Sequence, residues 1–295
     1  VQNGYRGIHL YRSSRNTISN NVISSNHNIG LYIGGMGNKI IGNTVTFNDY
    51  IGIDLSSSNN ILRNNNMSTN RYNLQVDPPA RPNDIDASNS VDGKSVYYLL
   101  NQNNLVIDPS TFPNVGYLGV INSKNIIVRG LNLTRNGSGV LFVNTTDSII
   151  ENVNASNNIF GIELDFSNHN FIHGNTLANN RFYGIWLEQS SGNEIIANNV
   201  SRNSVGISLR NSDGNTIICN AISHSHGIFV VKAAGIFLWR SYNNAIFHNN
   251  FINNTKQVHD LSWDYPEYAS SINVWDDGYP SGGNYWSDYN GTDLY

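Results

Sequence analysis

Carboxylate residues recur on one face of a short repeated element, where they would support general acid and base chemistry. The element reads Gly-Ile-x-Leu, and its third residue is Asp54 in one copy and Glu163 in a later copy. Because strand side chains alternate between two faces, this residue and the residue two positions along point the same way. Pairs of carboxyl groups act as acid and base in enzymes that cleave glycosidic bonds. The candidate catalytic residues at these two positions are Asp54, Asp77, Glu163, Asp165, Glu188 and Arg210.

The same two positions also carry aromatic side chains, which would suit a binding surface for polysaccharides. Aromatic rings present an apolar face that is able to stack on a sugar ring. The outward positions of a water-soluble repeat protein must be polar somewhere, so the acids equally suit an ordinary solvated face. We therefore expect carbohydrate binding without catalysis, and catalysis is the alternative. The candidate carbohydrate-binding residues are Tyr32, Trp186, Phe237 and Trp239.

Metal-binding side chains are few. Copper sites use His, Cys and Met, and the chain has eight His, one Cys and two Met. Cys219 and His248 hold the same repeat position on adjacent units, although we expect Cys219 to be buried and inert. Asp276, Asp277 and Asp288 lie among glycines and would suit calcium, although loop acids are usually solvated. Since none of these groups has a recognised ligand spacing, we expect no cofactor, with calcium as the alternative.

Asn-x-Ser/Thr triplets mark candidate N-glycosylation sites of an extracellular protein. A chain rich in Asn, Ser and Thr forms such triplets by chance, so the triplets alone decide little. Together with a charged fraction of only 13%, they favour an extracellular or cell-surface glycoprotein. The triplets begin at Asn66, Asn132, Asn136, Asn144, Asn154, Asn199, Asn253 and Asn290.

These residues are spaced by a sequence repeat that runs through most of the chain. The glycine of the element recurs at positions 7, 30, 52, 139, 161, 184, 206 and 235, mostly 22 or 23 residues apart. A fixed period in this range indicates a solenoid or a repeat array. Each unit holds short segments with alternating apolar residues, separated by Asn and Gly, which is typical of strands and turns. We expect Ile149, Ile172, Ile195 and Ile217 to form one interior column.

The repeat predicts an all-β fold, a single-stranded parallel β-helix of about 10–11 coils with 22–23 residues per coil. No unit contains two runs of good helix formers, so a helical repeat is excluded. Successive strands of a sheet lie about 4.8 Å apart. Equivalent Asn side chains would therefore be close enough to form amide ladders along the stack.

The pattern is interrupted at two places and ends before the chain does. We expect a β-helix over 1–254, with an excursion over 77–113 and a bulge over 225–235, and an aromatic and Gly-rich C-terminal cap over 255–295. Pro78 and Pro79 cannot supply the N–H groups of a central strand. Within the excursion, Asp92-Gly93 predicts the turn of a hairpin.

The repeats resemble those of the NosD-type and carbohydrate-binding/sugar-hydrolase (CASH) families. The run Asn-Ser-Val-Asp-Gly-Lys-Ser-Val-Tyr-Tyr-Leu at 89–99 and the run Gly-Gly-Asn-Tyr-Trp-Ser-Asp-Tyr at 282–289 are similar to modules of archaeal secreted proteins. The resemblance implies a right-handed helix, and the NosD name implies copper. The Asp-Pro-His-Asp motif of the alginate epimerase relatives is absent, since Asp77-Pro78-Pro79-Ala80 matches only its first two residues.

Composition limits the remaining possibilities. The net charge of −4 and the lack of a clustered basic face argue against nucleic acid, and no apolar run approaches the roughly 20 residues of a membrane span. The chain starts in mid-repeat, so we expect missing segments at both ends. We predict a non-catalytic extracellular module, structural, self-assembling into filaments or polysaccharide-binding. The alternatives are a lyase, hydrolase or C5-epimerase acting on an acidic glycan, and a copper-binding accessory protein.

Overall fold

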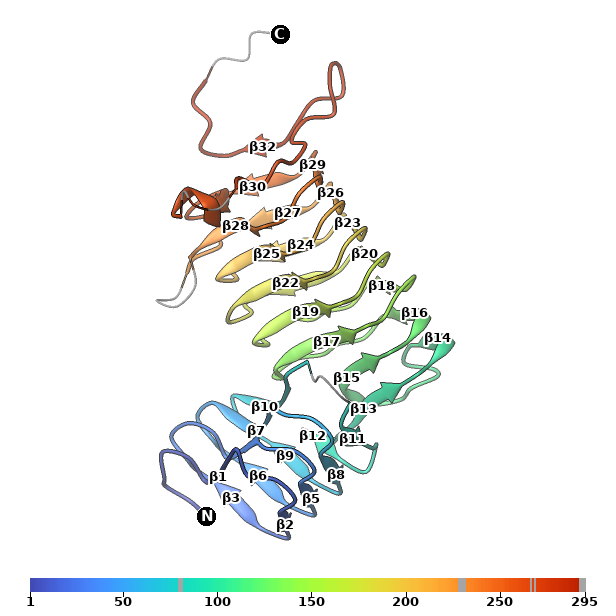
Figure 1. The fold of residues 1–295 in the computed structure, drawn as a ribbon, viewed down its shortest axis with the longest axis vertical. Coiled ribbons are helices and arrows are strands. Elements are labelled where there is room, and N and C mark those ends of the chain that lie inside the picture. The colour runs from blue at the N-terminus through green and yellow to red at the C-terminus, as the bar shows by residue number, and fades with distance from the viewer. Residues whose placement is uncertain (79–81, 228–231, 266, 268, 292–295) are drawn as a thin grey trace.

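The computed structural model describes residues 1–78, 82–227, 232–265, 267 and 269–291. It is a parallel β-solenoid of about 11 coils, as the repeat predicts, and its two ends lie at opposite ends of the long axis (Figure 1). Two stacks of coils follow one another along the chain. We call β1–β12 the N-terminal stack and β13–β32 the C-terminal stack. No helix of the described residues is long and apolar enough to cross a bilayer.

Three sheets run through the N-terminal stack, and each coil contributes one strand to each sheet. The first contains β1 (Ile8–Tyr11), β4 (Leu31–Gly34), β7 (Ile51–Leu55) and β10 (Tyr72–Val76). The second contains β2 (Thr17–Ser19), β5 (Lys39–Ile41), β8 (Ile61–Arg63) and β11 (Asp84–Ile85). The third begins with β3 (Val22–Ser24), β6 (Thr44–Thr46), β9 (Asn66–Ser68) and β12 (Ser90–Val91).

That third sheet continues through the C-terminal stack, where two further sheets complete the coils. It continues with β13 (Lys94–Leu100), β15 (Val115–Ile121), β17 (Ser138–Val143), β19 (Phe160–Asp165), β22 (Tyr183–Glu188), β25 (Val205–Arg210), β28 (Ala234–Trp239) and β31 (Val258–Asp260). The next sheet contains β14 (Asn103–Ile107), β16 (Lys124–Arg129), β18 (Ile149–Glu151), β20 (Phe171–His173), β23 (Glu194–Ile196), β26 (Thr216–Ile218) and β29 (Ala245–Phe247). The last contains β21 (Thr176–Ala178), β24 (Asn199–Ser201), β27 (Ala221–Ser223), β30 (Asn250–Ile252) and β32 (Tyr285–Trp286), and a short 3-10 turn, η1, spans Leu261–Trp263.

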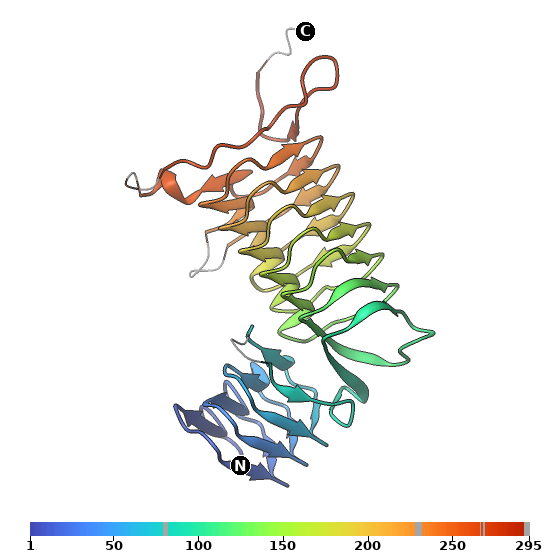
Figure 2. The same ribbon diagram turned by 45° about the vertical axis from the view of Figure 1, so that its right-hand side comes forward.

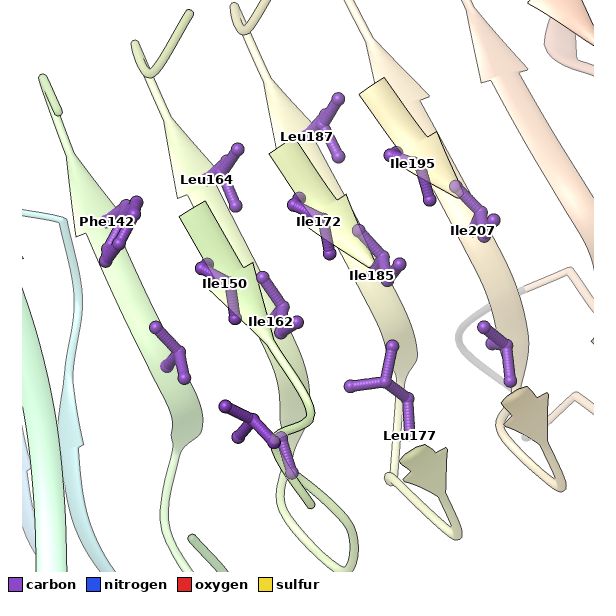
Figure 3. Close-up of a cluster of buried hydrophobic side chains, with 14 of the residues drawn as sticks. Phe142, Ile150, Ile162, Leu164, Ile172, Leu177, Ile185, Leu187, Ile195 and Ile207 are labelled. Carbon is purple, nitrogen blue, oxygen red and sulfur yellow. The ribbon is translucent and has the colours of Figure 1, made fainter. Parts of the chain in front are cut away.

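Aliphatic side chains of successive coils lie over one another inside the stack (Figure 3). Ile172 pairs in register with Ile195, and Ile195 with Ile217, and all three are fully buried. The prediction for Ile149 is wrong, because Ile150 pairs with Ile172 and is the buried residue. Ile150 and Ile172 are 22 residues apart, so the step of 23 residues assumed from Ile149 displaced the predicted column by one residue.

The recurring glycine is required by the close approach of successive coils. A Cβ on Gly161 would lie 2.4 Å from the carbonyl oxygen of Gly184, and one on Gly184 would lie 2.7 Å from that of Gly206. Distances this short are not tolerated between a side chain and a backbone oxygen. The position therefore admits no side chain without separating the coils.

Asparagine amides link the coils as the spacing predicts. Nδ2 of Asn170 donates to Oδ1 of Asn193 at 3.1 Å, and Nδ2 of Asn193 donates to Oδ1 of Asn215 at 3.1 Å. The same oxygens accept the backbone N–H of the preceding coil, at 2.8 Å in both cases. Each buried amide therefore satisfies backbone and side-chain groups together.

A serine ladder accompanies the asparagine ladders, and the sequence pattern did not reveal it. The hydroxyl of Ser190 accepts the backbone N–H of Ser167 at 2.9 Å, and that of Ser212 accepts the N–H of Ser190 at 3.0 Å. The hydroxyl of Ser241 continues the series at 3.1 Å from the N–H of Ser212. Serine is common in this chain, so its column did not stand out.

The chain changes from one stack to the other through the predicted hairpin. β12 pairs antiparallel with β13, and Asp92 and Gly93 form the turn with φ angles of 47° and 75°. After this turn, the sheet that held the third strand of each coil holds the Gly-Ile-x-Leu strand instead. Figure 2 shows the resulting offset between the blue stack and the green-to-red stack.

The two stacks share a wall. Tyr117 on β15 and Leu141 on β17 point outward from the C-terminal stack, yet both are fully buried and pack in the core of the N-terminal stack. β10 meets the segment before β17, where the N–H of Gly137 donates to the carbonyl oxygen of Leu74 at 2.8 Å. β15 and β17 are consequently buried on both faces. We call this contact region the seam.

The predicted bulge and cap are only partly described. Residues 228–231 of the bulge lie outside the described residues. In the tail, β32 pairs with β30, and Asn273 and Asn284 extend the ladders by accepting from Asn244 and Asn249, at 2.9 and 3.0 Å. The division of the chain at residue 254 stays a prediction.

The ladder predicts a large and local stability effect. Replacing Asn193 by Ala removes the acceptor of the Asn170 backbone N–H and one of the two donors to Oδ1 of Asn215, in a dry interior. We expect the free energy of unfolding in urea to fall by about 2–3 kcal/mol. Asn199→Ala on the same coil removes an exposed amide and should change it by less than about 0.5 kcal/mol. Equal effects of the two substitutions would contradict the ladder account.

Candidate functional site

The seam brings together acids from both stacks. Asp54 on β7 and Asp77 after β10 come from the N-terminal stack, and Glu163 on β19 comes from the C-terminal stack. The charge of Asp77 contributes to raising the pKa of both Asp54 and Glu163, so the three carboxyl groups share one electrostatic environment. The sequence identifies all three as catalytic candidates, but its repeat pattern does not place Glu163 beside the other two.

Glu163 is the most deeply buried of these acids, at 2% exposure. Burial raises its pKa to about 8, and the nearby Asp77 and Asp165 add to this effect. The hydroxyl of Ser138 donates a hydrogen bond to Oε2 of Glu163 and opposes the rise. Because the pKa lies above neutrality, Glu163 is mainly protonated at pH 7.

Asp54 lies in a less extreme environment. Burial raises its pKa to about 6 with help from Asp77, whereas the hydroxyl of Ser56, which donates to Oδ1 at 2.9 Å, and the charge of Arg6 lower it. Nε2 of Gln75 donates to Oδ1 of Asp77 at 2.9 Å and fixes that carboxylate at the seam. The carboxyl groups of Asp54 and Glu163, which come from the two different stacks, thus have different pKa values.

Polar atoms at the seam are not all paired. Oε1 of Gln75 and the hydroxyl of Tyr117 are buried and have no hydrogen-bond partner among the described residues. A Cβ on Gly137 would lie 2.3 Å from that Oε1. The seam is therefore tightly packed on this side and polar at the same time.

The second row of predicted acids forms an ion pair instead of a carboxylate pair. Asp165, Glu188, Arg210 and Trp239 occupy one register line across four coils. Nε of Arg210 lies 3.2 Å from Oε2 of Glu188, and its guanidinium group lies 3.9 Å above the ring of Trp239. Burial raises the pKa of Asp165 to about 6, with a further contribution from Glu188. Glu188 and Arg210 therefore form an ion pair in this row.

An aromatic cluster lies beside the seam acids on the outer surface. The ring of Trp186 is 5.0 Å from that of Phe160 and 5.4 Å from that of Tyr183, and Phe160 stacks nearly parallel on Tyr183 at 5.8 Å. Phe182 also packs on Phe160, at 5.9 Å, and lies 6.4 Å from Tyr183. We call Phe160, Phe182, Tyr183 and Trp186 the aromatic platform. Apart from Phe160, its side chains are partly exposed.

Arginine 181 joins the platform to the other stack. Its guanidinium carbon lies 5.7 Å from the ring of Phe182 and 4.9 Å from the ring of Tyr50 on the N-terminal stack. Sequence reasoning found Trp186 but missed Tyr50, Phe160, Arg181, Phe182 and Tyr183. The available signal was the aromatic residue directly before the glycine at Phe160-Gly161 and Tyr183-Gly184.

The other predicted sugar-binding residues lie apart from the platform rings. Tyr32 contacts His9 at 4.8 Å on the N-terminal stack and packs against the apolar cluster that supports the platform. Phe237 stacks on His259 at 5.7 Å near the C-terminal end, and Trp239 lies under Arg210. Tyr32 and Trp186 thus pack against one apolar cluster, whereas Phe237 and Trp239 lie elsewhere on the solenoid.

The predicted metal ligands are not assembled. Cys219 is exposed, contrary to the expectation that it would be buried, because it occupies a left-handed corner position with φ of 58°. His248 occupies the equivalent corner and contacts Ser281 at 3.2 Å. Among the described residues, no three His, Cys, Asp or Glu side chains gather as a metal site. Asp276 and Asp277 bind Gly278 and Ser281 within their own loop, and Asp288 lies elsewhere, beside a terminal cavity.

The glycosylation triplets differ in accessibility. Asn136 is fully buried, and its amide donates to the carbonyl oxygens of Gly116 at 2.8 Å and Thr134 at 3.3 Å. The folded chain therefore does not present Asn136 for modification, which argues against that site. The remaining asparagines are exposed or partly exposed: Asn66, Asn132, Asn144, Asn154, Asn199, Asn253 and Asn290.

Comparison with known families agrees with the geometry of the coils. A model of the family described as periplasmic copper-binding protein (NosD) matches residues 1–86 and 81–291. The chain belongs to the NosD family. No curated protein matches this NosD-family chain. The family description names copper; among the described residues, no three His, Cys, Asp or Glu side chains gather where they could hold a metal ion.

Several solved β-helix structures are similar to this NosD-family chain at low identity. The bacteriophage CBA120 tailspike protein 2 has 13% identity and a TM-score of 0.31, over 87% of this chain and 40% of that chain. The Dettilon tailspike has 13% identity and a TM-score of 0.29, over 88% and 61%. The Azotobacter vinelandii mannuronan C-5 epimerase A-module has 10% identity and a TM-score of 0.28, over 86% and 80%. At these TM-scores, none of the three bears on the function of the chain.

The seam predicts a specific dependence of stability on pH. Glu163 has an ordinary pKa of 4.5 and a folded pKa of about 8, so the folded state retains its proton over this range while the unfolded state loses it. The contribution of Glu163 to the free energy of unfolding should therefore fall as pH rises from about 5 to 8. Asp54 and Asp165 contribute only up to about pH 6. Between pH 6 and 8, Glu163 accounts for a slope of at most about 1.4 kcal/mol per pH unit.

Substitution isolates this contribution. Glu163→Gln should flatten the slope between pH 6 and 8 in urea-unfolding measurements, because the amide does not titrate. Glu194→Gln, at an exposed position on β23, should leave it unchanged. An unaltered slope in the Glu163 variant would show that this carboxyl group is not held protonated at the seam.

Proposed function

We propose that the chain is a non-catalytic glycan-binding module that acts outside the cytoplasm. The observation that carries this proposal is the aromatic platform, a set of packed rings on the outer face of successive coils next to polar and acidic side chains. The periplasmic description of the NosD family supports a location outside the cytoplasm. An extracellular or cell-surface position is part of the proposal.

The platform is suited to binding because its rings are held in place before a ligand arrives. Trp186 is packed against Phe160 and Tyr183, which limits its rotamers. A rigid ring loses little conformational entropy on binding, so more of the contact free energy remains as affinity. The apolar faces of sugar rings would stack on Trp186 and Phe182.

Polar groups beside the rings would orient the glycan. Asp165 and Glu188 are partly exposed and accept hydrogen bonds from sugar hydroxyl groups when ionised. Arg181, which packs on Phe182 and Tyr50, would donate hydrogen bonds to the glycan and accommodate a carboxylate of an acidic glycan. Because the solenoid repeats along its axis, neighbouring coils would contact neighbouring sugar units.

A second candidate function is catalysis on an acidic glycan by a lyase, hydrolase or C5-epimerase. Asp54 and Glu163 favour it, because they share one environment at the seam and differ in pKa, a pattern that can assign a base and an acid. The 2% exposure of Glu163 argues against it, since a general acid must reach the substrate. We therefore favour binding.

The binding proposal is tested by affinity electrophoresis in gels that contain alginate, polygalacturonate, mannan, xylan or β-glucan. We expect at least one polysaccharide to retard the protein and Trp186→Ala to weaken this interaction at least tenfold, since it removes a partly exposed ring of the platform. Phe47→Ala removes a ring that is 61% exposed on the N-terminal stack and should have no effect. The proposal would be contradicted if no polymer retarded the protein, or if Trp186→Ala and Phe47→Ala were retarded equally.

The catalytic candidate is tested separately with the same polymers. We expect the wild-type protein to release neither unsaturated uronates nor reducing ends, and to leave the uronate configuration unchanged by NMR. Turnover that disappears in both Asp54→Asn and Glu163→Gln would establish the second candidate in place of the first. Light scattering on the same samples reports whether the protein self-associates, which stays a prediction.

A further inference from the structure

A cavity of about 550 Å³ lies at the C-terminal end of the solenoid, away from the seam. Its walls come from the last coil and from the tail that follows it, the red segment in Figures 1 and 2. Trp263, Trp275 and Trp286 form its aromatic side. The sequence predicts an aromatic cap over 255–295; Trp275 and Trp286 pack against the core, and they also line this cavity.

The tryptophans are anchored by the core to different degrees. Trp286 on β32 stacks nearly parallel on the buried ring of Phe251 at 4.5 Å, so its position is fixed by the interior of the solenoid. Trp275 lies 6.2 Å from Trp286 at an angle of 46°. Trp263 on η1 is 61% exposed. Two rings are therefore part of the wall, and the third is free to contact a ligand from solvent.

The polar wall is held by buried hydrogen bonds. Asp260 is 3% exposed, and its two oxygens accept the backbone N–H groups of Ser262 and Ser271, each at 2.9 Å. Lys256 contacts Nδ1 of His259 at 3.0 Å, and Nε2 of His259 lies 2.7 Å from Oδ2 of Asp264. Since Asp264 accepts from Nε2–H, Nδ1 accepts from the ammonium group of Lys256. The side chain of His259 is only 1% exposed, so it positions Lys256 from inside.

We propose that this cavity binds a neutral sugar of one or two rings, at a site distinct from the aromatic platform. Its volume lies within the range of about 300–1,000 Å³ that is usual for small-molecule sites. Tryptophan faces would pack on the C–H face of a pyranose ring. Lys256 has two remaining N–H donors for sugar oxygens, and Asp288 accepts from sugar hydroxyl groups. The cavity is lined by two carboxylates, Asp260 and Asp288, and one ammonium group, Lys256, so its net negative charge disfavours an anionic sugar.

The test is a titration of the full chain with mono- and disaccharides of gluco, galacto and manno configuration, followed by tryptophan fluorescence and calorimetry. We expect one of them to bind saturably, and Trp263→Ala and Asp288→Asn each to weaken binding at least fivefold. Both residues are exposed, so their loss should leave the fold intact, as checked by circular dichroism. Trp186→Ala should bind the small sugar normally, because the platform is elsewhere.

Three results would overturn the proposal. One is the absence of saturable binding by any sugar of the panel. Another is unchanged affinity in both Trp263→Ala and Asp288→Asn. The third is preferential binding of choline, included as a competing ligand, because aromatic cavities with acidic groups also bind quaternary ammonium ions. If no small sugar binds but a polysaccharide still retards the protein, the cavity proposal fails and the platform proposal stands.

Discussion

The structure depends on the in-register stacking of equivalent residues at the strand spacing. Once coils lie about 4.8 Å apart, any side chain at a given position contacts its own counterpart above and below. This favours aliphatic residues inside, amides and hydroxyls at the corners, and glycine where two coils touch. The 2.4 Å separation that a Cβ on Gly161 would have from Gly184 shows how little freedom the stacking leaves. For the same reason, equivalent outward residues of successive coils form a row along the surface.

The seam is where this constraint is broken and where the candidate site lies. The hairpin at Asp92 and Gly93 shifts the Gly-Ile-x-Leu strand from one sheet to another, so outward residues of the C-terminal stack cover the core of the N-terminal stack. At the centre of the contact, the outward residues are apolar, as Leu141 is. Glu163 lies one coil further along, in register with Leu141, and is still buried. Acids and aromatics from two stacks meet there because the repeat was interrupted.

Much of the fold was predictable from the sequence, because each feature was repeated many times. The period, the Asn ladders and the hairpin turn follow from residue types at fixed spacing. The error at Ile149 arose in a single coil whose corner residues are Ser148 and Val153 in place of Asn. The exposure of Cys219 was missed because the left-handed corner accepts many residue types, including Ala197 and His248. Because the residues at this corner share no chemical type, residue types alone did not locate the corner in the sequence.

The candidate site was less predictable, because it joins segments about a hundred residues apart. The register rule places Asp165 beside Glu188, but no rule of spacing brings Asp77 near Glu163 or Arg181 over Tyr50. These contacts depend on the angle at which the second stack meets the first, and the chain reaches it through an irregular excursion. Local periodicity contains no information on that angle.

The most direct measurement of the central claim is hydrogen–deuterium exchange with and without a polysaccharide that the protein binds. If the platform is the binding surface, slowed exchange should appear in the segments that contain Arg181 to Glu188 and Tyr50 to Asp54, on both sides of the seam. The remaining coils, which are held by the same ladders, should exchange at unchanged rates. Protection that appears elsewhere along the solenoid and leaves these two segments unchanged would contradict the account.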